Sequence, residues 1–223
     1  MGKIKFSSDP LKFDDQGNVL DYYGNTTIAF VSDKAILDIA KEINEKLSHY
    51  DFYKKFSMLP IESLHMTLYS LIRERDRNTS VWPSYLEDFD FKKIDSILKE
   101  RVNQVSFPDD IKMRVVEFST TTLHLEPLTQ EVNNKLNKYR TELRDVSEID
   151  HGDIGTYTYH ISLSYVNQTL SDEDIEIISK INKAFTEDIE EKEIIITISN
   201  PKFVIFNNML AYYSDLSKRG NLY

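Results

Sequence analysis

The 223-residue sequence contains no cysteine. This absence excludes disulfide bonds, zinc sites built on thiolates and a cysteine nucleophile. Because chains without disulfides are typical of reducing compartments, we expect a cytoplasmic protein.

Positive charge and long apolar runs are also scarce. Lysine and arginine total 27 against 37 aspartates and glutamates, so the formal net charge is −10. Binding to a duplex nucleic acid needs a basic surface, and we expect no such partner. No apolar run approaches the length of a membrane helix, and the opening MGKIKFSSDPLKF lacks the apolar core of a signal peptide. We therefore expect a soluble chain with no membrane partner.

What is present suffices for a well-packed core. Hydrophobic residues make up 40% of the chain and aromatic residues 12%. The length suits one large domain or two small lobes.

Predicted strands and helices follow one another in an order that repeats. The first round has a strand, a helix, a strand, a helix and a strand, at about 25–31, 36–47, 61–72, 94–105 and 111–118. Ser32 is the expected N-cap of its first helix. The second round begins with a strand at 120–126, a helix from about Thr129, a strand at 158–166 and a helix opening at SDED. Three short strands close it, in EIIITIS, KFVIF and MLAYY.

A comparison of the sequence with itself at an offset of 95 residues supports a duplication. NTTIAFV lies over TTTLHLE, and His65, Thr67 and Leu68 meet His160, Ser162 and Leu163. We predict a single bilobal domain, 1–223, with lobe-like repeats at about 22–118 and 119–215.

The two aligned motifs, LHMTLYS and YHISLSY, are the candidate catalytic residues. Residues two apart in a strand share a face, so His65 lies with Thr67, and His160 lies with Ser162. The intervening residues are apolar and typical of a core. If the repeats pack about a pseudo-two-fold axis, two imidazoles and two hydroxyls converge. A single such motif is common by chance, and a strand histidine that only bonds the backbone is the alternative for each.

This set of side chains suits phosphoester chemistry. Imidazole has an ordinary pKa of about 6.5, so one histidine can accept a proton while the other donates one. The hydroxyls of Thr67 and Ser162 can donate to the phosphoryl oxygens. The sequence has no HExxH motif and no Asp-x-Asp run near either histidine. We expect neither a metal nor a cofactor.

The residues His65-Met66-Thr67-Leu68 and His160-Ile161-Ser162-Leu163 resemble the paired motifs of the two-histidine (2H) phosphoesterase superfamily. That group includes cyclic phosphodiesterases and the LigT-like RNA 2′,3′-cyclic phosphodiesterases. The resemblance extends from about Tyr22 to Tyr213. HMTLY followed by an arginine-rich loop and WP, and KMRV followed by LHLEPL, look like a bacterial branch of it.

The resemblance implies an α/β (α+β) fold with two pseudo-symmetric lobes, each a mostly antiparallel sheet flanked by helices. It implies metal-independent hydrolysis of a 2′,3′-cyclic or 2′,5′-linked phosphodiester of a small nucleotide or RNA end. His65 and His160 would be the acid–base pair, with Thr67 and Ser162 holding the phosphate. Which histidine is the base stays open.

Six further residues are candidates for substrate binding, each with a structural alternative. Arg73, with Arg75 and Arg77, either anchors a terminal phosphate or lies in a solvated loop. Trp82 either stacks on a base or anchors that loop, and Tyr69 either lines the groove or packs.

The other three candidates lie in the first strand of each repeat. His124, Asn25 and Thr27 either reach the groove or are structural. Arg140 and Arg144, by contrast, are predicted on a solvated helix face beside Glu142 and Asp145.

Two other functions remain open. One is a non-catalytic binder of nucleotides or RNA ends that keeps the pocket, and the other is a structural α/β protein with incidental histidines. Whatever the function, we expect a monomer.

Overall fold

Ten strands and four α-helices make up residues 9–220, the part of the chain that the computed structural model describes. The strands are β1 (Gly24–Phe30), β2 (Phe56–Met58), β3 (His65–Arg73), β4 (Lys112–Ser119), β5 (Thr122–Pro127), β6 (Tyr159–Ser162), β7 (Ser164–Val166), β8 (Ile195–Thr197), β9 (Lys202–Asn208) and β10 (Ala211–Tyr213). The helices are α1 (Lys34–Ser48), α2 (Phe91–Val102), α3 (Gln130–Ser147) and α4 (Asp172–Lys192).

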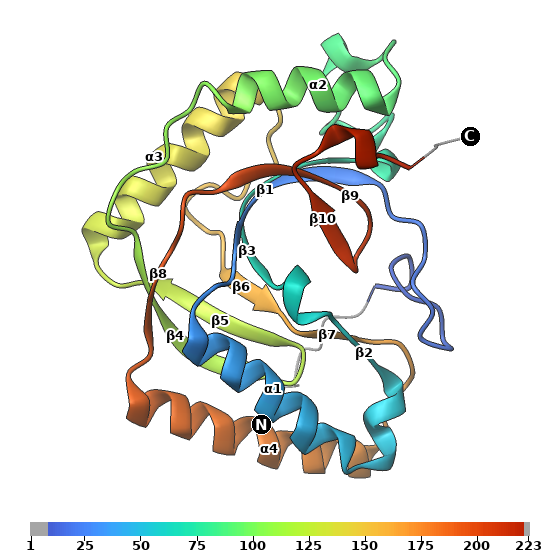
Figure 1. The fold of residues 1–223 in the computed structure, drawn as a ribbon, viewed down its shortest axis with the longest axis vertical. Coiled ribbons are helices and arrows are strands. Elements are labelled where there is room, and N and C mark those ends of the chain that lie inside the picture. The colour runs from blue at the N-terminus through green and yellow to red at the C-terminus, as the bar shows by residue number, and fades with distance from the viewer. Residues whose placement is uncertain (1–8, 221–223) are drawn as a thin grey trace.

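Eight of the strands form one curved sheet in the order β10-β9-β1-β3-β6-β5-β4-β8, with antiparallel neighbours (Figure 1). β2 and β7 pair separately. The α/β class with a large antiparallel sheet and flanking helices is confirmed. The two expected sheets meet at β3 and β6, where Met66 lies opposite Ile161 and joins the halves into one sheet.

The two half-sheets exchange their outer strands. β4 is the last strand of the first repeat in sequence but pairs with β5 in the second half. β9 is one of the closing strands of the second repeat but pairs with β1 in the first half. The order is therefore β9-β1-β3 in one half and β4-β5-β6 in the other, which puts the two motif strands side by side at the centre. The single-domain assignment stays a prediction.

The helices begin where short polar side chains can cap them. Asp33, not the expected Ser32, accepts hydrogen bonds from the first backbone amides of α1. Thr129 caps α3, and Ser171 caps α4 in a capping box with Asp174.

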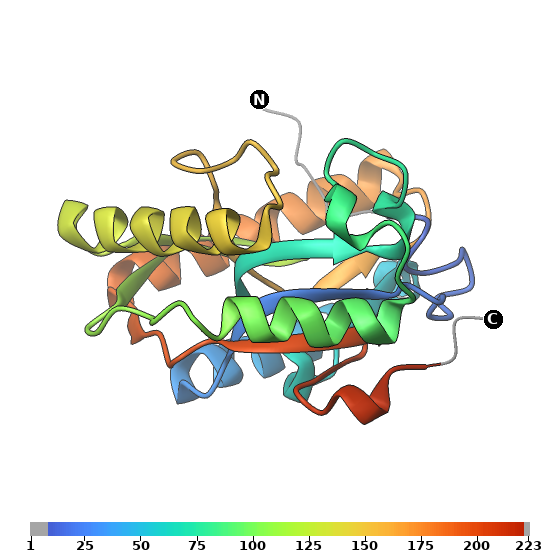
Figure 2. The ribbon, with the colours of Figure 1, turned by 90° about the horizontal axis from the view of Figure 1, so that it is seen from above.

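The helices cover both sides of the sheet. In Figure 1, α2 and α3 lie above it and α1 and α4 lie below it. Figure 2 views the molecule from the side of α2 and α3, with the strands running beneath them. α4 packs on β4, and α2 packs on α3. α3 also packs on β3, so the first motif strand is supported by a helix.

A buried ionic cluster fixes the first half-sheet to the end of the chain. The guanidinium of Arg219 donates to both carboxylate oxygens of Asp95, at 2.6 and 2.7 Å, and to the backbone carbonyls of Gly24 and Phe206. Asn25 donates to the same Asp95 carboxylate at 2.9 Å. A buried charge needs such partners, so these residues serve the fold.

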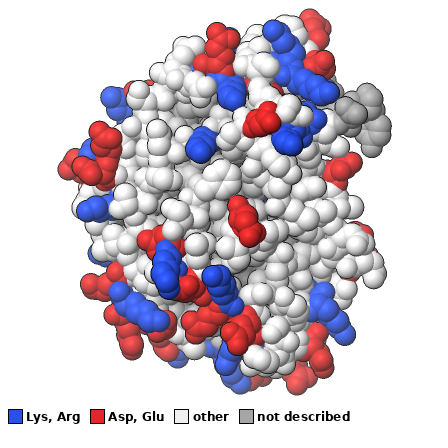
Figure 3. All heavy atoms as spheres, viewed as in Figure 1, with Lys and Arg blue, Asp and Glu red and all other residues white. Residues whose placement is uncertain are grey.

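Charge is spread over the surface. Figure 3 shows the face of Figure 1, where acidic and basic side chains mingle around the rim and most of the centre carries neither. This face has no continuous basic area. Within residues 9–220, no helix combines the length and apolar character needed to span a bilayer.

Candidate active site

The two motifs lie on neighbouring strands and on the same face of the sheet. Met66 of β3 is opposite Ile161 of β6 in an antiparallel pair. The register therefore places His65 beside Ser162 and Thr67 beside His160, with opposed Cα atoms about 5 Å apart. Opposed residues in a sheet point to the same side, so the two histidines and the two hydroxyls share one face.

Burial alternates along both motifs as this geometry requires. In β3, His65 and Thr67 are half-buried while Met66 is buried. In β6, His160 and Ser162 are half-buried while Tyr159 and Ile161 are buried. The polar face is thus open to a ligand, and the apolar face is packed.

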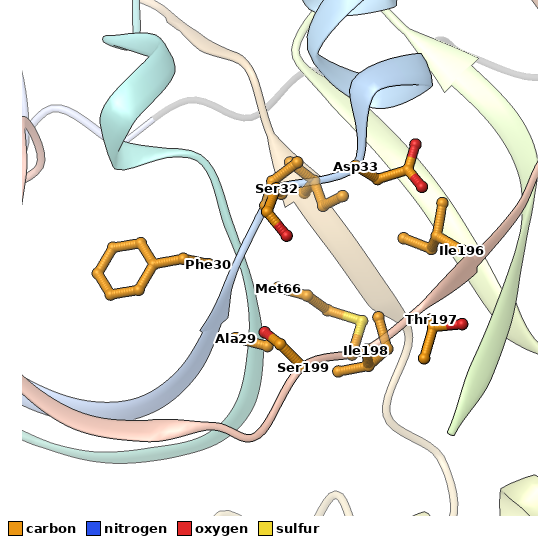
Figure 4. Close-up of a pocket in the computed structure, with 11 residues that line it drawn as sticks. Ala29, Phe30, Ser32, Asp33, Met66, Ile196, Thr197, Ile198 and Ser199 are labelled. Carbon is orange, nitrogen blue, oxygen red and sulfur yellow. The ribbon is translucent and has the colours of Figure 1, made fainter. Parts of the chain in front are cut away.

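The opposite face is filled. Met66 points into a cavity of about 20 Å³ between β1, β3 and the strand that contains Ile196, near the start of α1 (Figure 4). That volume holds about one water molecule and no nucleotide. A larger hollow of about 170 Å³ lies between α1 and the segment that precedes β3. Neither is lined by a motif histidine or hydroxyl, so the site is assigned from the side chains that share the other face.

The two histidines are held in the same way. His65 Nδ1 lies 2.7 Å from the carbonyl oxygen of Ser63, and His160 Nδ1 lies 3.0 Å from that of Thr158. A carbonyl can only accept, so Nδ1 of each neutral ring carries the proton. Nε2 is therefore the atom that accepts or donates a proton in the site.

The surroundings of His65 strongly perturb its imidazole. Its ring lies edge-on to Tyr212 of β10, with the ring centroids 4.3 Å apart. The pKa of His65 is lowered to about 4, chiefly by burial, with smaller contributions from the charges of His160 and Lys12 and against the opposing effect of the bond to Ser63. The ring is neutral near pH 7.

His160 has a more polar neighbourhood. Burial lowers its pKa, with contributions from the charges of His124 and Lys12. His124 lies directly opposite His160 in the β5–β6 pair, and the Tyr157 ring is 6.3 Å away. The structure thus brings the predicted His124 to the site face.

The hydroxyls flank the two rings. Thr67 hydrogen-bonds with the phenol of Tyr157, whose pKa burial raises to about 12. Ser162 lies opposite Thr122 of β5. Both hydroxyls can donate to oxygens of a bound phosphoryl group. Within the described part of the chain, no three histidine, aspartate or glutamate side chains are grouped so as to hold a metal ion.

A β-bulge moves Tyr69 away from the site, which corrects its prediction as a substrate-binding residue. Thr67 pairs with Ile28 but Tyr69 with the adjacent Thr27, so Leu68 is an extra residue in β3 and the alternation of faces breaks there. Tyr69 is 1% exposed, and its hydroxyl donates to the Ile149 carbonyl.

Asn25 and Thr27 are also not brought to the site, in contrast to their prediction. The Asn25 side chain is buried between Asp95 and the backbone amide of Ile72. Thr27 is 1% exposed, so no ligand reaches it.

Arg73 and Trp82 likewise lie elsewhere. Arg73 is eight residues along β3 from His65, about 26 Å by strand geometry. Its guanidinium forms two hydrogen bonds with the carboxylate of Asp76. Trp82 is buried against Phe91 and beneath Arg77, so it anchors the loop to the core.

Arg140 is buried rather than solvated as predicted. It is 1% exposed, donates to the carbonyl of Leu68 and the carboxylate of Asp153, and lies 4.0 Å over the Tyr157 ring. It therefore supports Tyr157, which in turn contacts Thr67.

Three residues of the site were missed from the sequence. They are Lys12, from the turn-rich segment before β1, Tyr157, from the loop before β6, and Tyr212, from the last strand. TYTYHIS puts an aromatic residue beside the second motif, which is the one local signal available. Lys12 and Tyr212 come from opposite ends of the chain, and no local sequence signal places either of them near a motif.

Comparisons with known proteins identify a family and a fold. A family model named 2H-phosphodiest, "Domain of unknown function (DUF1868)", matches residues 12–124. The crystal structure of ATU0111, a conserved protein of unknown function from Agrobacterium tumefaciens str. C58, has a TM-score of 0.82 at 21% identity. It covers 90% of this chain and 88% of that one. At this identity the likeness shows the fold.

Another solved structure, TT0787 of Thermus thermophilus, has a TM-score of 0.38 at 12% identity, over 81% of this chain and 86% of that one. That score carries no argument about the fold. Among curated proteins, none matches this chain.

Proposed function

Because this chain belongs to the two-histidine phosphodiesterase family, we propose that it hydrolyses a phosphodiester by acid–base catalysis between His65 and His160. The substrate class is a 2′,3′-cyclic or 2′,5′-linked phosphodiester of a nucleotide or RNA end, and the reaction uses no metal. The observation that carries the proposal is the pairing of Met66 with Ile161, because it sets both imidazoles and both hydroxyls on one half-open face.

His65 is the base in this mechanism. Its pKa, lowered to about 4 by burial, keeps Nε2 free to accept a proton from water at neutral pH. As that proton moves to His65, the water oxygen forms the new bond to phosphorus.

His160 is the acid. Its Nε2 proton passes to the ribose oxygen as the old phosphorus–oxygen bond breaks. The bound phosphate is an anion close to the ring, and an opposite charge raises the pKa of an imidazole. Substrate binding thus gives His160 the proton that it later donates. Thr67 and Ser162 donate to the two non-bridging oxygens while negative charge builds on them.

Turnover of a panel of 2′,3′-cyclic nucleotides and 2′,5′-linked dinucleotides in EDTA tests this function. Wild type is expected to hydrolyse one class, and His65→Ala and His160→Ala to lose at least about 10³-fold in kcat. His49→Ala is the matched control, because His49 is exposed at the end of α1.

Each other outcome has a definite meaning. If wild type binds a panel member but does not hydrolyse it, the protein is a nucleotide-binding protein and not a hydrolase. The absence of both binding and turnover across the whole panel overturns the proposal. Activity that EDTA abolishes overturns the metal-independent mechanism.

A further inference from the structure

Lys12 lies against the chain segment that follows the second histidine motif, although it is 153 residues away from that segment in sequence. Its Nζ donates to the Tyr165 hydroxyl at 3.1 Å and lies 4.6 Å from the centroid of that ring. Tyr165 belongs to β7, which begins two residues after the end of β6. Lys12 is thus tied to the strand segment that follows the second motif.

The segment that carries Lys12 has a fixed conformation. Phe13 pairs with Val19 across a small loop, and its ring is buried against Tyr165 with centroids 5.5 Å apart. The backbone carbonyl of Lys12 accepts from Leu20 at 2.9 Å. The ammonium group is therefore held in place before any ligand arrives.

The charge of Lys12 reaches both catalytic rings. It lowers the pKa of His65 and the pKa of His160, and no other lysine or arginine is among the causes of either shift within the described residues. A single cation thus faces both halves of the site.

Among the described residues, no carboxylate neutralises the charge of Lys12. Within residues 9–220, no aspartate or glutamate forms an ion pair with Lys12, whereas Arg73, Arg75 and Arg77 are paired with Asp76, Asp9 and Glu74. The side chain is half-buried in a chain of net charge −10. A partly desolvated cation with no carboxylate partner among residues 9–220 is suited to receive an anion.

We propose that Lys12 is a phosphate-binding residue of the active site, whose ammonium group pairs with a non-bridging phosphoryl oxygen of the scissile diester. This inference rests on the proposed function and adds to it the one full positive charge that the motif residues lack. The contact strengthens as negative charge develops on that oxygen in the transition state.

The arrangement also couples binding to proton transfer. In the free protein, the charge of Lys12 disfavours protonation of both rings. When an anionic phosphate pairs with Lys12, that repulsion is offset, and His160 can take up the proton required for catalysis.

Replacement of the charge tests the inference directly. Lys12→Met keeps a similar length without the charge, Lys12→Arg keeps the charge, and Lys183→Met is a control, since Lys183 is 78% exposed on α4. We expect Lys12→Met to lose about 10²-fold in kcat/KM, Lys12→Arg to retain most activity and Lys183→Met to equal wild type. Equal melting temperatures for the three variants would exclude a folding defect.

A pH profile separates an electrostatic from a structural role. His65 faces His160, Lys12 and Tyr212, and His160 faces His124, Lys12 and Tyr157. Lys12→Met alone removes a positive charge from this set, so both histidine pKa values rise. The acid limb of kcat/KM therefore moves to higher pH in Lys12→Met and stays in place in Lys12→Arg.

Failure of this inference is distinguishable from failure of the proposed function. An active wild type with unchanged kcat/KM and an unchanged acid limb in Lys12→Met overturns the role of Lys12 and leaves the function intact. If wild type hydrolyses no diester, calorimetric titration with inorganic phosphate tests whether Lys12 forms an anion-binding site. Binding that is lost in Lys12→Met and kept in Lys12→Arg supports the anion site, and equal or absent binding in all three proteins overturns it.

Discussion

The two histidine motifs have the same local geometry but different neighbouring side chains. In each half, a strand histidine bonds through Nδ1 to the carbonyl oxygen two residues earlier, at 2.7 Å for His65 and 3.0 Å for His160. In each half, the histidine shares its face with a hydroxyl two residues later. This common geometry is what a duplicated unit would provide.

The neighbours of the two rings differ. His65 lies against the Tyr212 ring at 4.3 Å and has its pKa lowered to about 4. His160 lies beside His124 and Tyr157, and its pKa is lowered by burial, with contributions from the charges of His124 and Lys12. In the proposed mechanism, one strand motif therefore provides both a base and an acid, because the flanking side chains set the proton affinity of each ring.

The largest expected effect is a difference between the two histidine variants that depends on the leaving group of the substrate. His65→Ala and His160→Ala should each lose about 10³-fold or more on a nucleotide diester. On bis(4-nitrophenyl) phosphate, whose leaving group needs no proton, His160→Ala should recover most of its activity relative to wild type and His65→Ala should not. Steady-state kcat on both substrates measures this. The opposite pattern would exchange the roles of the two histidines.

An intermediate effect is expected at the hydroxyls. Thr67→Val and Ser162→Ala each remove one donor to the phosphoryl oxygens and should lower kcat by about 10- to 100-fold with little change in stability. Thr67→Ser and Ser162→Thr restore the hydroxyl and serve as controls. Rates that stay within twofold of wild type in both deletions would show that the hydroxyls do not bind the transition state.

The sequence predicted the site where the strands are regular. The alternation in LHMTLYS and YHISLSY placed two histidines and two hydroxyls on polar faces, and burial in β3 and β6 follows that alternation. At the offset of 95 residues, the sequence of β1 aligns with that of β5 and the sequence of β3 aligns with that of β6. The aligned strands occupy equivalent places in the two halves of the sheet.

The prediction failed where the structure departs from local rules. The bulge at Leu68 turned Tyr69 to the buried side, and period-2 alternation contains no sign of an extra residue. Arg140 looked solvated because a charged helix face gives no information on what packs over it.

Contacts between residues far apart in the sequence could not be predicted either. Lys12 meets Tyr165 across 153 positions, and Tyr212 reaches His65 from the last strand. Such contacts depend on the exchange of strands between the half-sheets, which no linear pattern records.

The smallest expected effect concerns Tyr212, the aromatic neighbour that distinguishes His65 from His160. Tyr212→Ala should open His65 to water and raise its pKa from about 4 towards the ordinary value of 6.5. The base is then protonated over a wider range, so the acid limb of kcat/KM should move up by about one to two pH units while kcat at pH 8 changes little. A pH–rate profile of both proteins measures this shift.

Tyr213→Ala is the matched control for that shift. Tyr213 is the next residue of β10, pairs with Ile205 and by strand alternation points to the other face. Its acid limb should coincide with that of wild type. If Tyr212→Ala leaves the limb in place as well, burial by Tyr212 is not what separates His65 from His160. The two rings would then owe their different roles to the charges around them, and Lys12→Met would become the variant that moves the limb.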